Sequence, residues 1–190
     1  MKIENIFLEN GYVIFDVENI SSLEKIRDFV NQKLIKNLNL LKNRKINLDK
    51  FHKIIKIKDL NQNRLLLINQ LNSFRKIKDI YYSLAKNCIH KIVGNELAIQ
   101  NNINLSIQFP KDDSSLLPLH SDTWSGDSPF EVVLWVPLVN CYKTKSMFIL
   151  NQKKIKKFDK IYEEKTSIKS SDLNKKIKND LELIDIKFGQ

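Results

Sequence analysis

The segment LHSDTWSG, residues 119–126, holds a histidine and an aspartate two positions apart, His120 and Asp122. On an extended strand, side chains two residues apart point to the same side, so both groups could reach one metal ion. An imidazole nitrogen and a carboxylate oxygen are two of the three ligands of the facial triad that binds non-haem iron(II). The tripeptide alone is a weak signal, because a hydrogen-bonded loop histidine beside a turn carboxylate has the same spacing.

The residues around this pair favour the metal interpretation. The stretch LPLHSDTWSGDSPFEVVLWVPLV resembles the metal-strand region of phytanoyl-CoA dioxygenase-like oxygenases, in which HxD precedes Thr and Trp and a long strand ends in Trp-x-Pro-Leu. The matching positions here are Thr123, Trp124, Trp135, Pro137 and Leu138. Within that group, the chain resembles oxygenases of sporadic bacterial carbohydrate-biosynthesis clusters. The specific part of the resemblance runs from about Pro118 to Leu150.

The resemblance implies an activity and a set of roles. His120 and Asp122 would bind Fe(II), 2-oxoglutarate would be the cosubstrate, and a small molecule, sugar-linked or anionic, would be hydroxylated. Gln108 would contact the cosubstrate or the substrate, although an exposed polar residue fits the same position. Trp124 would line the substrate site, although an aromatic at a strand end is often a core residue. Residues 144–146 could contact the cosubstrate.

Two features of that family are missing from the sequence. The family has a second histidine ligand on a later strand and a cation beyond it for the distal carboxylate of 2-oxoglutarate. The other histidines, His52 and His90, both precede the HxD pair, and no arginine follows Arg75. We therefore expect a C-terminally truncated chain, and the alternative function is a non-catalytic or decayed jelly-roll module for binding or assembly.

Hydrophobic periodicity predicts an α+β fold. Apolar residues at helical spacing predict one helix over 23–34, N-capped by Ser21 or Ser22, and another over 73–93 that ends at Gly94. Alternating or continuous apolar runs predict strands at 11–15, 103–109, 130–139, 146–150 and 181–188. Helices followed by strands, without a GxGxxG loop, favour N-terminal helices flanking a double-stranded β-helix, the cupin-like jelly roll. We expect one domain over 1–190, mainly helical over 1–98, with incomplete jelly-roll strands over 99–190.

The charge is strongly basic, at +10, but only four of the 32 basic residues are Arg. Specific nucleic-acid contacts favour Arg, and an excess of Lys, Asn and Ile is typical of AT-rich genomes, so we expect no nucleic-acid partner. Residues 33–58 contain nine Lys or Arg and one acid, a surplus that could attract an anionic substrate. With no long apolar run, a soluble cytoplasmic protein is expected.

Two further expectations concern the thiols and the sheet. Cys88 and Cys141 have no CxxC spacing, so both are expected to be buried thiols rather than a disulfide or a zinc site. A jelly roll that lacks its last strands leaves an exposed sheet edge, so self-association through that edge is expected.

Overall fold

The computed structural model describes residues 2–41, 46–112, 117, 119–155, 158 and 176–190. Its contacts divide the chain into two compact units. The sheet unit consists of Met1–Ile14, Leu116–Trp135 and Cys141–Ile186, and the helical unit of Phe15–Ser115, Val136–Asn140 and Lys187–Gln190. The metal candidates His120 and Asp122 lie in the sheet unit, whereas Gln108 lies in the helical unit. None of the described helices is long and apolar enough to cross a membrane.

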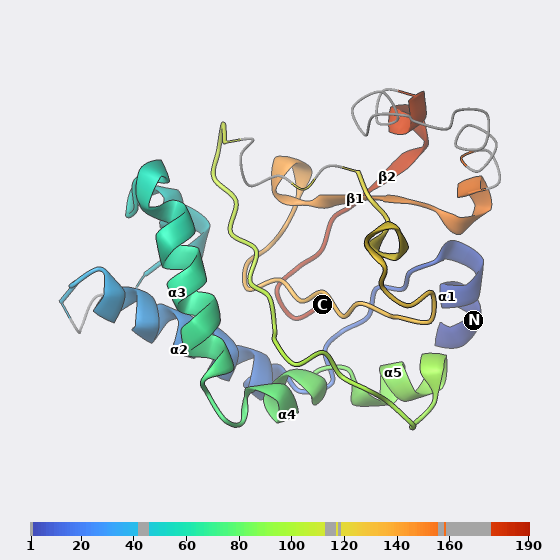
Figure 1. Cartoon of the computed structure of the whole chain (residues 1–190), viewed down its shortest axis with the longest axis horizontal. Helices are drawn as coiled ribbons and strands as arrows, with labels where there is room; N and C mark the ends of the chain where they lie inside the picture. The colour runs from blue at the N-terminus through green and yellow to red at the C-terminus, as the bar shows by residue number, and fades with distance from the viewer. Residues whose placement is uncertain (1, 42–45, 113–116, 118, 156–157, 159–175) are drawn as a thin grey trace. The chain divides into compact units, whose positions relative to one another are not determined.

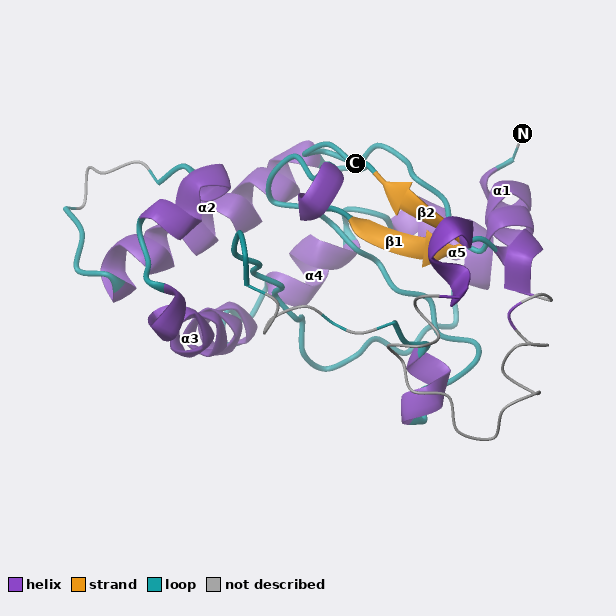
Figure 2. Cartoon of the chain, turned by 90° about the horizontal axis from the view of Figure 1, so that it is seen from above, coloured by secondary structure: helices purple, strands orange, loops and turns teal. Residues whose placement is uncertain are grey.

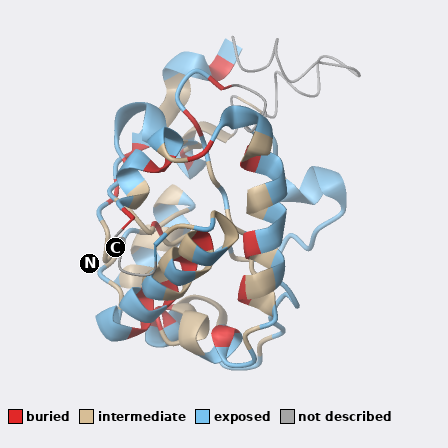
Figure 3. Ribbon diagram, turned by 90° about the vertical axis from the view of Figure 1, so that its left-hand side faces the viewer, coloured by how far each residue is buried: buried red, intermediate tan, exposed pale blue. Residues whose placement is uncertain are grey.

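The helical unit is built on α2 (Ile20–Asn37), which packs against α3 (Leu60–Asn72) and α4 (Ile77–Tyr82) (Figure 1). The α2 residues Leu23, Ile26, Val30 and Leu34 are buried, at the spacing that places them on one helix face. Figure 3 shows this separation of buried and exposed residues around the helices. The predicted helix over 23–34 is therefore confirmed. Its N-cap is Asn19, whose Oδ1 accepts a hydrogen bond from Ser22 N, and not Ser21 or Ser22.

The predicted helix over 73–93 is two helices, α4 and α5 (Lys86–Val93). Ser83 Oγ donates to the carbonyl of Ile80, and Ala85 has φ −146°, so the helical ladder stops between them. The carboxylate of Glu18 then accepts hydrogen bonds from the backbone N–H groups of Asn87 and Cys88, at 3.1 and 2.9 Å. Glu18, which is distant in the sequence, therefore caps the start of α5. This second helix begins within an apolar pattern that continues unbroken through α4 and α5. The predicted C-cap at Gly94 is confirmed, with φ 85°.

Two short 3-10 helices, η1 (Leu48–Lys53) and η2 (Ile57–Asp59), complete the described helices of this unit. Two hydrophobic clusters form its core. One surrounds Leu34, Phe51 and Leu67, and the other surrounds Leu23, Ile77 and Leu84. Residues 103–109 show the predicted alternation of exposure, with Phe109 buried, but they form no described strand, so the strand prediction there is wrong. The side chain of Asn72 instead bonds both the N–H and the carbonyl of Ile103.

The sheet unit contains β1 (Met147–Leu150) and β2 (Leu181–Ile184), which pair antiparallel with Phe148 opposite Leu183 (Figure 2). An isolated bridge between Cys141 and Ile186 extends the pairing. β1 confirms the strand predicted at 146–150. β2 confirms the first half of the strand predicted at 181–188. Residues 130–139 belong to no described strand, so that prediction is wrong. The jelly-roll core stays a prediction, because one two-stranded sheet does not test it.

The N-terminal strand predicted at 11–15 is also wrong. The chain begins with α1 (Ile3–Asn10), and Gly11, at φ 81°, ends this helix by donating its N–H to the carbonyl of Phe7. Residues 12–15 have no ladder partner among the described residues. Within the sheet unit, α1 packs against η5 (Gln152–Lys154), and Lys153 Nζ lies 2.6 Å from the carboxylate of Glu9. The other short 3-10 helices of the unit are η3 (Asp122–Ser125), η4 (Lys143–Lys145) and η6 (Lys178–Asp180).

Candidate metal centre

His120 and Asp122 come together at the start of a one-turn helix rather than on a strand. Ser121 has extended dihedral angles, φ −119° and ψ 138°, and η3 begins at Asp122. His120 Nε2 lies 3.6 Å from Asp122 Oδ1. The expectation that both groups point to one side is therefore confirmed in outcome, but the strand geometry from which it was derived is wrong.

The distance between these two atoms suits a shared metal ion. Donors that bind one ion at about 2.1 Å and at right angles to each other are about 3.0 Å apart. A small rotation of either side chain closes the observed 3.6 Å to that separation. The side chains are 45% and 50% exposed, so an ion can reach both from solvent without any opening of the core. The two donors thus fit two positions of a divalent-metal site.

The loop around the pair is held by its own short hydrogen bonds. Ser121 Oγ and Thr123 Oγ1 are 2.8 Å apart, and Trp124 N donates to the carbonyl of Ser121 at 3.0 Å. Gly126 closes the turn at φ 96°, where a side chain would be strained, and donates to the carbonyl of Thr123. The backbone of His120–Gly126 is thereby fixed locally, and the two candidate ligands stay at adjacent positions.

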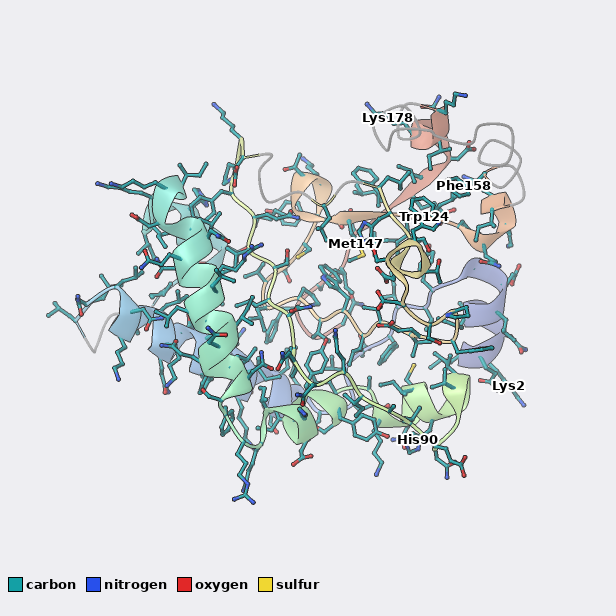
Figure 4. The ribbon with its side chains drawn as sticks, in the orientation of Figure 1. Lys2, His90, Trp124, Met147, Phe158 and Lys178 are labelled. Carbon is teal, nitrogen blue, oxygen red and sulfur yellow. The ribbon has the colours of Figure 1, made fainter. Side chains whose placement is uncertain are left out.

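Trp124 stacks on Phe158, with ring centroids 5.8 Å apart and an interplanar angle of 13° (Figure 4). The Trp124 side chain is nevertheless exposed on its other side, so it is not the core aromatic of the alternative interpretation. It forms an apolar wall in the same loop as the metal candidates. Phe158 was missed by the sequence interpretation, because it lies in a lysine-rich stretch without periodicity.

The remaining site candidates are not gathered at this loop. Gln108 is exposed on the polar face of residues 103–109, in the helical unit. In residues 144–146, the Oγ of Ser146 is buried without a hydrogen-bond partner, and Lys145 Nζ lies over the ring of Tyr142. Neither observation assigns a cosubstrate contact. Pro118, at the start of the resembling segment, lies outside the described residues.

A third ligand is not found within the described part of the chain. No group of three or more His, Cys, Asp or Glu side chains there could hold a metal ion. His52 is exposed and His90 bonds Tyr82 through Nε2, and both belong to the helical unit. Cys88 and Cys141 are buried thiols outside any disulfide, as predicted. The described residues therefore fit two of the three protein positions of a facial triad.

The sheet unit also contains a polar network that the sequence did not indicate. Tyr12 Oη donates to Glu182 Oε2 at 2.9 Å, and Asn151 Nδ2 donates to the same oxygen at 3.3 Å. These two hydrogen bonds hold the pKa of Glu182 below its ordinary value. Burial, together with the Glu182 carboxylate, raises the pKa of Tyr12. The network joins the segment after α1 to β2 and has the character of a structural contact.

Comparison with known proteins adds no relative. No family model matches the sequence, and no curated protein and no solved structure matches it either.

Proposed function

We propose that this chain provides His120 and Asp122 as two ligands of a non-haem iron(II) centre in a 2-oxoglutarate-dependent oxygenase that hydroxylates a small molecule. The observation that carries the proposal is the 3.6 Å approach of an imidazole nitrogen and a carboxylate oxygen, both open to solvent. The resemblance of residues 118–150 to oxygenases of the phytanoyl-CoA dioxygenase kind supports the same chemistry. A sugar-linked or anionic substrate is proposed on the resemblance and on the basic charge.

The residues of the loop would have separate roles. His120 Nε2 would donate a neutral lone pair and Asp122 a negative oxygen, the ligand set that favours Fe(II) while leaving coordination positions open. The exposed side of the Trp124–Phe158 stack would exclude water from one side of a bound organic molecule. Iron(II) with 2-oxoglutarate supplies the oxidation of an unactivated C–H bond by O₂. No further step is assigned, since the described residues include neither a third ligand nor a cosubstrate cation.

A second candidate is a non-catalytic binding or assembly module. The half exposure of His120 and Asp122 favours it, because catalytic metal sites need a water-poor cavity. Two ligands alone also hold iron weakly, so such a module could bind a metal without turning over a cosubstrate. The two candidates therefore differ in activity and not in metal binding.

An anaerobic Fe(II) titration followed by admission of O₂ separates them. The proposal predicts that His120→Ala and Asp122→Ala each weaken Fe(II) binding at least about tenfold, the effect expected for loss of one ligand. Matched controls are His52→Ala and Asp127→Ala, which remove an exposed histidine and an acid of the same loop. Wild-type protein should then convert 2-oxoglutarate to succinate when O₂ is added.

Each result has a defined meaning. Site-dependent Fe(II) binding with succinate formation supports the oxygenase. Site-dependent binding without succinate supports the binding module. Equal binding by wild type and both site variants removes His120 and Asp122 from any metal function, and with them both the iron centre and the oxygenase.

A further inference from the structure

The helical unit has a surface groove of about 820 Å³, and all of its lining residues belong to that unit. This volume is within the range of small-molecule sites. One wall is a face of α2, and the other walls are residues 46–49, 138–140 and Phe188. Neither His120 nor Asp122 lines the groove, so a ligand bound there is separate from the proposed iron centre.

The α2 wall of the groove presents hydrogen-bond acceptors. Asp28, Asn31 and Gln32 line it. Residues three and four apart are neighbours on a helix surface, so both carboxamides lie beside the carboxylate of Asp28. That carboxylate can only accept, and the Oδ1 of Asn31 is buried with no hydrogen-bond partner among the described residues. A bound group that donates hydrogen bonds would therefore satisfy this wall.

The other walls present amide donors. Asn140 Oδ1 accepts from the backbone N–H of Phe188 at 2.9 Å. Asn47 Oδ1 accepts from Asp49 N at 3.0 Å. Each bond fixes the oxygen of a carboxamide and leaves its Nδ2 group as a donor, and a donor fixed in this way loses little entropy when it binds an acceptor. A ligand of this groove must therefore both donate and accept, which a hydroxyl group does.

The charges of the lining favour an uncharged ligand. They are one cation, Arg27, and two acids, Asp28 and Asp49. Arg27 is already engaged, because its Nη2 lies 4.0 Å from Glu24 Oε1 and its guanidinium carbon lies 4.0 Å from the centroid of the Phe188 ring. An oxyanion would meet the acids with no cation to spare for it. An ammonium group would meet Arg27 and could not use the amide donors.

We propose that this groove binds an uncharged, polyhydroxylated ring, which is the chemistry of a sugar. Its hydroxyl groups donate to Asp28 and Asn31 on α2, and they accept from the Nδ2 groups of Asn47 and Asn140. Its C–H groups pack against the apolar part of the lining, to which Leu138 belongs. The apolar side chains of the lining are Ile35, Ile46, Leu48, Leu138, Val139 and Phe188.

Two alanine substitutions on α2 test this inference with little risk to the fold. Asp28 and Gln32 are both exposed, and alanine is the most favourable residue in a helix, so Asp28→Ala and Gln32→Ala should keep α2 intact. Asp79→Ala in α4 and Gln62→Ala in α3 are the matched controls. They make the same chemical changes at exposed helix positions outside the groove lining.

The measurement is an NMR titration at constant ionic strength with D-glucose, D-galactose and N-acetyl-D-glucosamine. D-glucose 6-phosphate, the ammonium form of D-glucosamine and cyclohexanol are the charged and apolar comparisons. We expect saturable shifts of the Asn47 and Asn140 side-chain amides with at least one uncharged sugar, and none with cyclohexanol. Asp28→Ala should weaken that binding at least about tenfold and Gln32→Ala at least about threefold, whereas both controls change it less than about twofold.

Four results would overturn the inference. They are an absence of saturation with all three uncharged sugars, tighter binding of the phosphate or ammonium compound than of D-glucose, equal binding of cyclohexanol, and equal losses in Asp79→Ala and Asp28→Ala. Circular dichroism at 222 nm confirms that each variant retains its helices. If Asp28→Ala unfolds, Asp28→Asn replaces it, since it keeps the shape and removes the charge. Because no metal is added, failure here leaves the iron proposal untouched.

Discussion

The helical unit and the sheet unit differ in how they are held together. In the helical unit, residues three and four apart on α2 share two hydrophobic clusters with α3 and α4, and side chains such as Leu23 and Leu34 are almost fully buried. In the sheet unit, the residues that pair between the two four-residue strands are more than thirty positions apart in the sequence. The side chain of Phe148, in one of these strands, remains 60% exposed. Local periodicity thus builds a dense core in one unit, whereas the candidate metal loop lies in the unit with the thinner core.

This contrast predicts unequal responses to matched truncations. Leu34→Ala should destabilise the helical unit by roughly 2–5 kcal/mol, since a fully buried leucine leaves a cavity. Phe148→Ala should cost less than about 1 kcal/mol, the size of a cross-strand pair. Urea unfolding followed at 222 nm reports the helices, while the fluorescence of Trp124 and Trp135, the only two tryptophans, reports the sheet unit. A larger loss for Phe148→Ala would contradict the comparison.

Alkaline pH tests the burial of the helical core independently. Burial raises the pKa of Tyr81 to about 12 from its ordinary 10.0. The unfolded chain therefore loses this proton first, and stability should fall by up to roughly 2–3 kcal/mol between pH 10 and 12. Tyr81→Phe should flatten that part of the stability profile, measured by urea unfolding at pH 9 to 12. An unchanged slope would show that Tyr81 is solvated.

A single remote contact should be enough to disturb α5. Glu18→Ala removes the carboxylate that caps Asn87 N and Cys88 N, and a lost N-cap costs about 1 kcal/mol. Amide hydrogen exchange of α5 should increase, while exchange in α2 stays unchanged. Glu96→Ala, the loss of an exposed acid, is the control. Equal exchange in both variants would mean that the cap contributes nothing.

The smallest effect is expected in the polar network of the sheet unit. The pKa of Glu182 is lowered by its bonds from Tyr12 and Asn151, so its contribution to stability is present above the ordinary value of 4.5 and is lost as the pH falls through the lowered pKa. Tyr12→Phe should raise this pKa toward 4.5, as followed by carboxyl-carbon NMR of Glu182. A pKa that does not move would mean that the Tyr12 bond is absent in solution.

The same contrast explains what could be predicted from the sequence. The helix with Leu23, Ile26, Val30 and Leu34 was found because its apolar residues recur three or four positions apart. The strand at 146–150 was found from a short run of adjacent apolar residues. The separate start of α5 was missed because the group that caps it, the carboxylate of Glu18, lies about seventy residues away in the sequence. Residues 130–139 were assigned to a strand from a nearly continuous apolar run, and such a run does not show whether a neighbouring strand is present to pair with it.

The candidate site shows the same limit. The residue types at 120 and 122 indicated a metal pair, and the side chains do converge, but through the turn of η3 and not through strand alternation. Phe158, which stacks on Trp124, had no sequence signal.

The central claim is that one metal ion contacts His120 Nε2 and Asp122 together. The chain has three histidines, so ¹⁵N NMR of the imidazole nitrogens during a Zn(II) titration, with Zn(II) as a diamagnetic substitute for Fe(II), can follow each one separately. We expect the His120 Nε2 resonance to shift saturably, with His52 and His90 unchanged, and Asp122→Ala to weaken the shift at least about tenfold. A His120 resonance that stays still, or that responds equally in Asp122→Ala, would contradict the claim.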